Sequence, residues 1–583
     1  MAKRKHRPTR VKADQRSGSI ARSADQTLTT HNVAALPILN QILGRMKLQE
    51  FLKAYLPSED GRTKLLSSRA LMVLTKNILV ARSPVYGVGE WAADYAPDLL
   101  GLLPKELDFL NDDRVGRSLD KLHKADRSSL ALALSAHVVK HFGVELDQLH
   151  NDSTTISFYG AYDDAGQETP DPDRPVPSIT FGHSKDHRPD LKQLLYILTV
   201  ARDGGMPVYF TAASGNVTDD TTHRDTWDLL CRLAERKDFL YVADCKLATT
   251  ENMNYIAGNH GRFITVLPRT RKEDRAFRKR LVQRQIAWQH LLDKTNDEGQ
   301  VTDRLSVCDE PALSKEGFRI WWYFSTRKAE LDVVARTTRI NRALAQLSEL
   351  RDRLLSPRSR IRTKAKATEA ANDILRQRNV EDLITITVIE RVVENFRQAT
   401  RGRPGKDTRY VKEIRTHCSL DYDIDNEAIA RDALCDGVFP LITNAKSLSA
   451  RDVLDAYKKQ PLVEKRFSQL KTDFRVAPVY LKSVRRIEAL LCVYFFVLMA
   501  EALLERELRQ AMKREDVPAL PMYPEGRPCH RPTARRVIDL FDTVKRHTLQ
   551  TGRQEPAIMI TDLSRAQRKI LKLLRLRATD YGR

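Results

Sequence analysis

The stretch Phe239–Asp244, F-L-Y-V-A-D, decides the fold, because five apolar residues run without interruption and end at a carboxylate. A run of this kind predicts a strand buried on both faces of a sheet. Functional residues usually gather where the strands of such a sheet end, so Asp244 is a candidate catalytic residue. The alternative is an ordinary helix cap for a helix near Thr250.

The residues on either side of this stretch indicate an α/β unit. Further strands are predicted at Leu191–Val200, Pro207–Ala212 and Phe263–Leu267, and a helix at Thr221–Glu235. A first strand that leads into Asp152 gives the order strand, strand, strand, helix, strand, helix, strand. The residues before Asp152, V-E-L-D-Q-L-H-N, alternate poorly, so that strand has little support from the pattern itself.

The composition indicates a large folded protein with a polyanionic partner. Its 583 residues suggest three to five domains, and 42% hydrophobic with 30% charged residues excludes a largely disordered chain. Lys and Arg number 98 against 76 Asp and Glu, so the net charge is +22 and the isoelectric point is near 9.6. Nucleic acid is the first partner that such a charge suggests, and an anionic membrane surface is the second.

A membrane span, a secretory signal and a structural zinc site are not expected. The longest uncharged apolar run, Ala489–Ala500, has 12 residues, short of the ~20 that a spanning helix needs, and it predicts a buried helix. The N-terminus has no apolar segment behind its charges. Seven scattered cysteines without a C-x-x-C motif indicate reduced thiols in a cytoplasmic protein.

Composition along the chain predicts six regions. They are a disordered basic arm (1–30), a helical region that could bind DNA or dimerise (31–143), the first part of the α/β unit (144–270), an insertion that interrupts this unit (271–430), the second part of the unit (431–512) and a C-terminal region (513–583), Pro-rich and then helical. In the insertion, basic helices are predicted at Arg275–Leu292 and Glu330–Leu355, and strands at Phe318–Phe324 and near Leu383–Val393. A strand at Gly437–Thr443 then leads into a helical stretch from Ser449 to Lys513.

A third carboxylate, Glu464, lies in the run Y-K-K-Q-P-L-V-E-K-R-F-S-Q-L-K. At 100° per residue, Tyr457, Gln460, Glu464 and Lys471 share a helical stripe roughly 60° wide. Pro461 should begin or kink a helix at that point, so Tyr457 and Gln460 belong to the stripe only if the kink is mild.

These motifs resemble those of the DDE transposases of bacterial insertion sequences, in particular the subgroup with a Y-R-E-K third motif. The resemblance covers about residues 31–530 and rests on two aspartates after strands and on the Y-x2-Q-x3-E-x6-K run. Other segments are also similar, among them Asp152-Ser-Thr-Thr155, Gly182–Gln193 (G-H-S-K-D-H-R-P-D-L-K-Q), and Gly215-Asn216 with Asp219. Gln460 departs from the pattern, since the family usually has arginine there.

The resemblance implies an RNase H-like, mixed-sheet catalytic core that a large insertion divides, with flanking helical regions. It implies that Asp152, Asp244 and Glu464 are catalytic residues that converge on metal, although Glu464 lies 220 residues after Asp244. Three carboxylates suit two Mg²⁺ ions, with Mn²⁺ as a substitute, and two such ions promote in-line displacement at phosphorus.

The same resemblance implies a double-stranded DNA substrate, both transposon ends and target, a homodimer on those ends, no membrane partner and a location in the bacterial cytoplasm at the nucleoid. Expected DNA contacts are Lys471, Tyr457, Gln460, Arg188, Lys185 and His183, with His187 in the same stretch. The basic runs 269–284 and 351–366, each with net charge +6, and Trp288, Trp321 and Trp322 could grip DNA ends. Two alternatives remain: a sequence-specific DNA-binding protein with a vestigial nuclease fold, and a membrane-surface protein.

Overall fold

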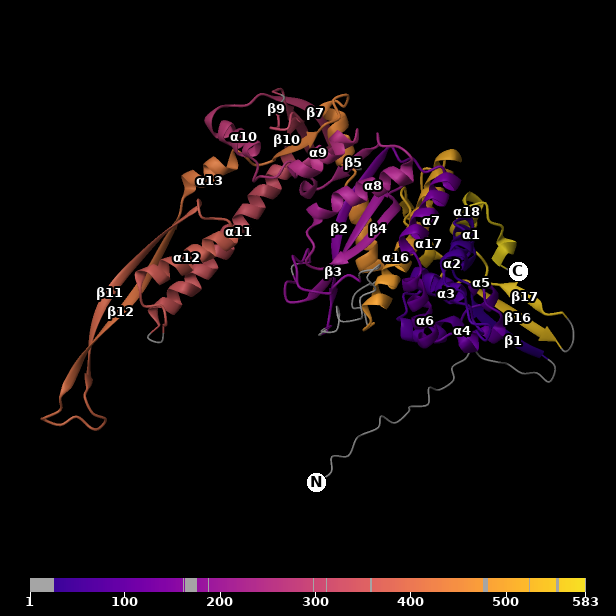
Figure 1. The fold of residues 1–583 in the computed structure, drawn as a ribbon, viewed down its shortest axis with the longest axis horizontal. Helices are drawn as coiled ribbons and strands as arrows, with labels where there is room; N and C mark the ends of the chain where they lie inside the picture. Colours follow the sequence, from indigo (N-terminus) through magenta and orange to yellow (C-terminus); the bar gives the residue numbers. More distant parts are fainter. Residues whose placement is uncertain are drawn as a thin grey trace. The chain divides into compact units, whose positions relative to one another are not determined.

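The computed structural model describes residues 26–581 except 161, 163–175, 187, 297, 311, 357–358, 475–480, 524 and 552–554. The chain forms two compact units (Figure 1). The first consists of residues 1–263 and 455–583, and the second, residues 264–454, interrupts it in sequence. This division agrees with the predicted fold class, a core split by a large insertion, but the interrupting unit is longer than the predicted insertion at residues 271–430 and includes the strand predicted at Gly437–Thr443.

The first unit is built on a mixed sheet whose strand order matches an RNase H-like core. Its strands are β2 (Gln148–Phe158), β3 (Lys192–Ala201), β4 (Met206–Ser214) and β5 (Leu240–Ala243), in the order β4-β3-β2-β5. The first three are antiparallel neighbours, and β5 is parallel to β2. The chain passes into the second unit within β6 (Arg262–Val266).

The predicted order of elements in this unit is confirmed. Helix α8 (His223–Ala234) follows β4, and α9 (Thr250–Gly258) lies between β5 and β6. Asp152 is placed differently from the prediction, because β2 continues to Phe158 and the aspartate lies inside the strand. The parallel pairing of β2 with β5, however, ends one residue before Asp152.

Helix α16 (Val484–Arg514) is the central helix of the first unit. It packs against β4 and against α3 (Ser67–Val80) and α6 (Asp112–Lys124). The Phe495 ring stacks on Phe210 of β4 with centroids 4.7 Å apart. By length and composition α16 could cross a membrane, but 94% of its apolar window is buried inside the unit. Ala489–Ala500 is thus a buried helix, as predicted.

Residues 31–143 are mainly helical, as predicted. The helices are α1 (Leu36–Arg45), α2 (Leu48–Tyr55), α3, α4 (Val88–Ala93), α5 (Pro97–Leu100), α6 and α7 (Arg127–Phe142). The ends of the chain differ from the prediction. Residues 26–30 belong to β1 (Gln26–Asn32), which pairs with β16 (Lys545–Thr551), and β16 pairs with β17 (Ala557–Ile560). Helices α17 (Ala534–Leu540) and α18 (Arg565–Leu573) complete the C-terminal region, whereas the basic arm up to residue 25 lies outside the described residues.

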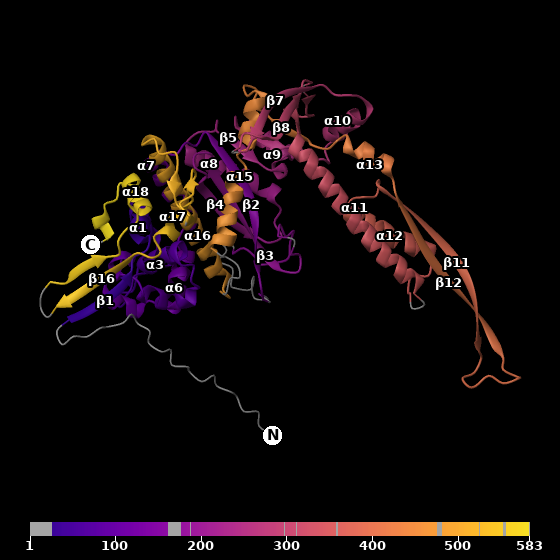
Figure 2. The same cartoon turned by 180° about the vertical axis from the view of Figure 1, so that it is seen from behind.

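The second unit combines a sheet with a helical hairpin and a long ribbon (Figure 2). The sheet has the order β6-β13-β10-β8-β7, with β13 at Val438–Thr443, β10 at Arg319–Ser325, β8 at Val301–Cys308 and β7 at Trp288–Thr295; short β9 (Ala312–Leu313) pairs with β10. The remaining elements are α10 (Lys272–Gln283), α11 (Thr326–Leu355), α12 (Lys364–Arg378), β11 (Ile384–Gln398), β12 (Tyr410–Ile424), α13 (Asn426–Ala433) and α14 (Ala450–Tyr457).

Two predictions for this unit are wrong. The predicted helix Arg275–Leu292 ends at Gln283, and Trp288 begins a strand because it pairs with β8. Trp322 is 1% exposed, and its ring stacks on Phe277 at 3.9 Å, so it belongs to the core and cannot stack on a DNA base.

Candidate active site

Asp152 and Asp244 lie side by side on neighbouring parallel strands. The last parallel pair joins Asn151 to Ala243. Asp152 is the next residue of β2, and Asp244 is the first residue after β5. Neighbouring strands lie about 4.8 Å apart, so the two carboxylates project from adjacent positions. Asp244 also caps a short 3₁₀ helix, since its Oδ1 accepts from the Lys246 amide at 3.0 Å. The predicted alternative, a cap for the helix near Thr250, is wrong, because Thr249 caps that helix and Asp244 caps only the short 3₁₀ helix Cys245–Leu247.

A lysine ammonium lies among these carboxylates. Lys185 Nζ is 3.4 Å from Asp152 Oδ1 and 2.9 Å from Asp219 Oδ2. It also donates to the Ser153 hydroxyl at 2.6 Å and to the Ser153 carbonyl at 2.8 Å. The G-H-S-K stretch thus reaches the pair of aspartates, and Asp219 is added to the cluster.

Burial and mutual repulsion make the two aspartates hard to ionise. Burial raises the pKa of Asp152, and burial followed by the charge of Asp152 raises the pKa of Asp244. Burial opposes the charge on Lys185, but Asp152, Asp219 and Asp244 outweigh it and raise the pKa of the ammonium. A positive charge close to these carboxylates therefore stabilises their ionised forms.

A buried polar network fastens β2 to the segment that carries Glu464. Gln148 Nε2 donates to the Ala456 carbonyl at 3.0 Å and lies 2.8 Å from His150 Nε2. An amide nitrogen only donates, so His150 Nε2 accepts and the ring proton is on Nδ1. That Nδ1 donates to Gln460 Oε1 at 3.0 Å, and Gln460 Nε2 donates to the Asn151 carbonyl at 3.0 Å. Burial lowers the pKa of His150 to about 4, in agreement with this neutral form.

Helix α15 (Pro461–Ser468) carries Glu464 in its first turn and begins at the proline, as predicted. Arg466, which is 1% exposed, donates to the carbonyls of Gly204 and Gly205 in the turn between β3 and β4. Arg466 and Lys465 also pair with Glu505 of α16, at 3.2 and 2.6 Å. The helix is therefore held by the sheet on one side and by α16 on the other.

The Tyr457 hydroxyl is influenced electrostatically by Glu464 and by the two aspartates. Burial raises the pKa of its hydroxyl, and the charges of Asp244, Cys245, Asp152 and Glu464 raise it further. One phenol thus lies within electrostatic reach of all three predicted carboxylates, although the Glu464 side chain is exposed.

The predicted stripe of four side chains does not form. Tyr457 ends α14, a turn follows, and Gln460 precedes α15. Lys471 lies in a π-helical turn, Gln469–Asp473, so it does not continue the α-helical spacing from Glu464. Gln460 is 6% exposed and uses both ends of its amide within the protein, so it presents no group to a ligand at the surface.

The other predicted DNA contacts lie on the surface near the cluster. Lys471 Nζ pairs with Asp186 Oδ1 at 2.6 Å, beside Lys185 in sequence. Arg188 forms two hydrogen bonds with Asp190, at 2.7 and 2.8 Å, and His183 is exposed. His187 lies outside the described residues.

The donor chemistry of this site fits a hard divalent cation, because Asp152, Asp244, Asp219 and Glu464 offer only carboxylate oxygens. The arrangement is not a finished metal site. Among the described residues, no three Asp, Glu, His or Cys side chains are close enough together to hold an ion. Lys185 supplies the positive charge next to Asp152 and Asp219 instead.

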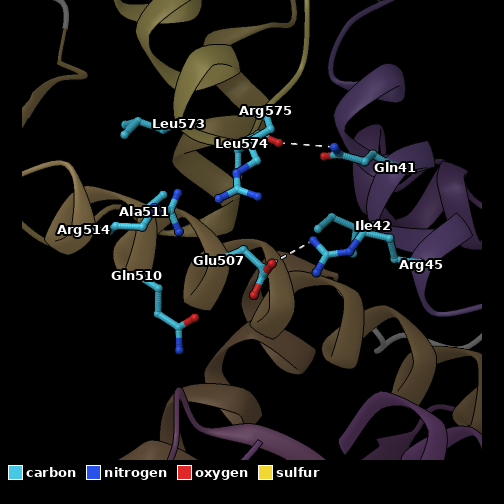
Figure 3. A pocket seen from close by; sticks show the side chains of 10 residues that line it. All are labelled: Gln41, Ile42, Arg45, Glu507, Gln510, Ala511, Arg514, Leu573, Leu574 and Arg575. Carbon is cyan, nitrogen blue, oxygen red and sulfur yellow. Dashed lines mark hydrogen bonds and ion pairs between the residues drawn. The ribbon is translucent and has the colours of Figure 1, made fainter. Parts of the chain in front are cut away.

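The first unit also has a cavity that contains none of the predicted site residues (Figure 3). It has a volume of about 390 Å³ and lies between α1, α16 and the end of α18. Arg45 closes one side by pairing with Glu507 at 2.7 Å, and Gln41 donates to the Leu574 carbonyl at 3.2 Å.

Sequence reasoning missed the roles of Asp219 and His150. Asp219 was noted only as part of a similar segment, and its contact with Lys185 arises from folding across 34 residues. His150 lies in a stretch without clear alternation, and its only sequence signal is its position two residues before Asp152.

The fold and the paired carboxylates define a nuclease-like α/β core of the RNase H type. The family model described as "Transposase DDE domain" matches residues 151–500, more than half of the 583 residues, and the chain belongs to this family. Transposases of this family generally use divalent metal ions and act on DNA. A second model, "Domain of unknown function (DUF4277)", matches residues 28–136.

Curated proteins and solved structures do not narrow the family further. No curated protein matches the chain. A solved structure entitled "Cryo-EM structure of piggyBac transposase synaptic complex with hairpin DNA (SNHP)" aligns at 8% identity with a TM-score of 0.24. The alignment covers 50% of this chain and 59% of that one, and a likeness this low carries no argument.

Proposed function

We propose that this protein is the transposase of a bacterial insertion sequence, of the subgroup with the Y-R-E-K motif, that binds the ends of its element and catalyses DNA strand cleavage and strand transfer. Membership of the transposase family supports the class. The observation that carries the proposal is the adjacent position of Asp152 and Asp244 at the end of the β2–β5 pairing, with α15 packed on β2.

The catalytic residues are Asp152, Asp244 and Glu464, which would hold two Mg²⁺ ions, or Mn²⁺ in their place. When bound, these ions activate the attacking oxygen and stabilise the leaving oxygen at phosphorus. The raised pKa values of Asp152 and Asp244 support this assignment. Two buried carboxylates that repel each other are strongly stabilised in their ionised forms when a cation binds between them. Glu464 on its exposed helical turn completes the donor set.

The residues around the carboxylates bind and orient the DNA. Lys185 pairs with Asp152 and Asp219, and Lys471 pairs with Asp186; both ammonium groups can turn to a phosphate that enters the site. Arg188 and His183 are exposed in the same stretch and extend this basic surface. Tyr457 lies within electrostatic reach of the carboxylates, and its hydroxyl can donate to a phosphate oxygen.

The test is cleavage of a duplex that joins the terminal sequence of the element to its flanking DNA, in Mg²⁺ buffer. Asp152→Asn, Asp244→Asn and Glu464→Gln are each expected to reduce cleavage at least about 1,000-fold and to leave duplex binding intact. Asp220→Asn, which neutralises a neighbour of Asp219, is the matched control and should cleave normally. Near-normal cleavage by one variant would remove that residue from the site, and binding without cleavage by the unaltered protein would favour a vestigial nuclease.

Location in the bacterial cytoplasm at the nucleoid and a homodimer on paired ends follow from the same proposal. Mass measurement by light scattering, with and without the end duplex, tests the dimer. A single protein copy on each DNA would contradict it.

A further inference from the structure

The ribbon formed by β11 and β12 is longer than the helices that support it (Figures 1 and 2). Fifteen residues of each strand are paired without a break, from Ile384 with Ile424 to Gln398 with Tyr410. In the half near the rest of the unit, one face of the ribbon packs on α11 and α12. Val388, Cys418 and Leu420 of that face are at most 5% exposed.

The same face continues into the outer half, where nothing in the described chain covers it. Alternate residues of a strand share a face, and the pairing register puts even-numbered residues of both strands together. Val392, Phe396, Tyr410 and Ile414 therefore continue the buried face, yet they are 63%, 65%, 54% and 61% exposed. Glu394 and Lys412 lie on the same face and pair with each other at 2.6 Å, so the apolar strip formed by the four large side chains includes one ion pair. Large exposed apolar side chains gathered in this way mark an interaction surface.

The end of the ribbon is strongly basic. Residues 397–412, R-Q-A-T-R-G-R-P-G-K-D-T-R-Y-V-K, carry six Lys or Arg and one Asp, a net charge of +5. Arg401, Arg403, Lys406 and Arg409 are exposed, and none of them is in an ion pair with a described residue. The connecting loop is fixed by the Ala399 amide, which donates to the Arg409 carbonyl at 2.8 Å.

Charge decides between the two candidate occupants of this surface. A second copy of the chain carries +22 and would be repelled by the basic end, whereas double-stranded DNA would be attracted. The shape agrees, because a two-stranded ribbon fits the major groove, which is about 12 Å wide. The uncovered stretch of roughly eight residues per strand spans about 27 Å, the rise of about eight base pairs.

We propose that the outer half of the β11–β12 ribbon is a DNA-binding arm, in which the basic end holds phosphates and the apolar strip lies against the groove. The inference rests on the proposed function, since it takes DNA as the substrate. It adds a contact surface that is separate from the carboxylate cluster and from the residues that the sequence suggested for DNA binding.

The test uses the full-length protein and a fluorescein-labelled 30-base-pair duplex of random sequence, with the affinity measured by anisotropy between 50 and 200 mM salt. The triple substitution Arg401→Ala, Arg403→Ala, Arg409→Ala should weaken binding at least 10-fold at 100 mM salt. It should also reduce the slope of log K against log salt by about 2 to 3, because up to three phosphate contacts are lost. The matched control Arg327→Ala, Arg342→Ala, Lys446→Ala removes three exposed charges of the same unit that lie outside the ribbon and outside the basic runs 269–284 and 351–366, and it should change the slope by less than about 1.

A second variant separates the apolar strip from the charges. Phe396→Ser with Ile414→Ser should weaken binding about 5- to 10-fold while the salt slope stays the same, since no cation is lost. All these side chains are exposed, so melting temperatures should match that of the unaltered protein, which excludes misfolding as the cause.

Three outcomes would overturn the inference. The first is that the triple ribbon variant has the same salt slope as the unaltered protein, although the unaltered protein binds and cleaves DNA. This result would leave the proposed function intact. Another is equal losses in the ribbon and control variants. The third is a change from dimer to monomer with normal DNA binding, which would identify a second copy as the occupant. If the unaltered protein binds no duplex, the proposed function fails together with the inference.

Discussion

At the scale of single residues, Gln460 departs from the Y-R-E-K motif of the proposed subgroup, which has arginine at this position. Here the amide bridges His150 and the Asn151 carbonyl beneath Asp152. A bulky cation would not fit a position that is 6% exposed and already satisfied by neutral partners. Gln460 therefore acts as a positioning residue that links the strand of Asp152 to the helix of Glu464.

Gln460→Ala is expected to destabilise the first unit by roughly 2 kcal/mol, because it leaves a buried imidazole N–H and a carbonyl without partners. Urea denaturation monitored by tryptophan fluorescence measures this. Cleavage should fall about 10- to 100-fold with duplex affinity nearly unchanged, whereas loss of a direct DNA contact would weaken affinity. Lys459→Ala, the exposed neighbour, is the control for stability.

The pair of Lys471 and Asp186 allows a second test at this scale. Both side chains are partly exposed, so their ion pair is worth at most about 1 kcal/mol and can yield to a phosphate. Lys471→Ala should weaken duplex binding and lower the salt slope by about 1. Asp186→Ala frees the lysine and should bind DNA as well as the unaltered protein or better. Equal effects of the two substitutions would mean that the pair is only structural.

Lys76 predicts a pH dependence of stability. It is 5% exposed, it donates to the Leu99 carbonyl at 2.9 Å, and burial lowers its pKa to about 8. The unfolded chain therefore binds this proton more tightly, so stability should rise as pH increases from about 8 towards 10.5. Lys76→Met should stabilise the protein at pH 7 by on the order of 2 kcal/mol and remove that rise. Thermal melts from pH 7 to 10 measure both effects, and a Lys76→Met profile parallel to that of the unaltered protein would contradict the assignment.

At the scale of elements, α15 depends on one buried carboxylate of α16. Glu505 is 1% exposed; burial opposes its charge, but Arg466, Lys465 and Arg509 outweigh burial and lower its pKa. Its second oxygen accepts from the Ala534 amide at 3.1 Å, at the start of α17. Glu505 thus joins three helices.

Glu505→Gln is expected to cost about 3 kcal/mol, because Arg466 would remain buried without its counter-charge. Glu507→Gln, two residues further along α16, removes a more exposed charge and should cost about 1 kcal/mol or less. Chemical denaturation of the two variants gives the comparison. Equal costs would show that α15 does not depend on this ion pair.

Elements whose pattern is local could be predicted from the sequence. β5 and β13 are short apolar runs next to turn residues, and α16 is a long apolar helix, so composition alone indicated them. β7 could not be recognised, since W-Q-H-L-L-D-K-T carries helix-like spacing and becomes a strand only by pairing with β8. β1 and β16 pair residues that lie more than 500 positions apart, which no local pattern reports.

The residues of the candidate site also divide into those that the local sequence marks and those that only the folded structure brings together. The motif and the strand ends pointed to Asp152, Asp244 and Glu464, because each is marked by its own neighbours in sequence. The contact of Lys185 with Asp219 and the bridge from His150 to Gln460 depend on three-dimensional packing across 34 and 310 residues. The periodicity put Tyr457 and Gln460 on the face of Glu464 only if the kink at Pro461 was mild, and the structure has a turn before Pro461 that interrupts the helix.

At the scale of the whole molecule, the net charge of +22 predicts that the affinity for DNA decreases as the salt concentration rises. The affinity of the unaltered protein for a random duplex should fall at least about 100-fold between 50 and 200 mM salt, since each phosphate contact releases counterions. Anisotropy titrations in EDTA measure this without cleavage. An affinity that stays constant over this range would mean that the excess of basic residues does not contact nucleic acid.

The order of elements along the chain has a consequence for synthesis on the ribosome. β4 ends at Ser214, but α16, which covers it, is complete only at Arg514, 514 − 214 or 300 residues later. At about 5–20 residues per second, the apolar side of the nascent sheet waits roughly 15–60 s for its cover. Chaperones that bind nascent chains should occupy it during that interval. Glu464 also emerges late, so under the proposed function the nascent protein cannot assemble its three catalytic carboxylates, or cut DNA close to its own translation site, before the first 464 of the 583 residues have been made.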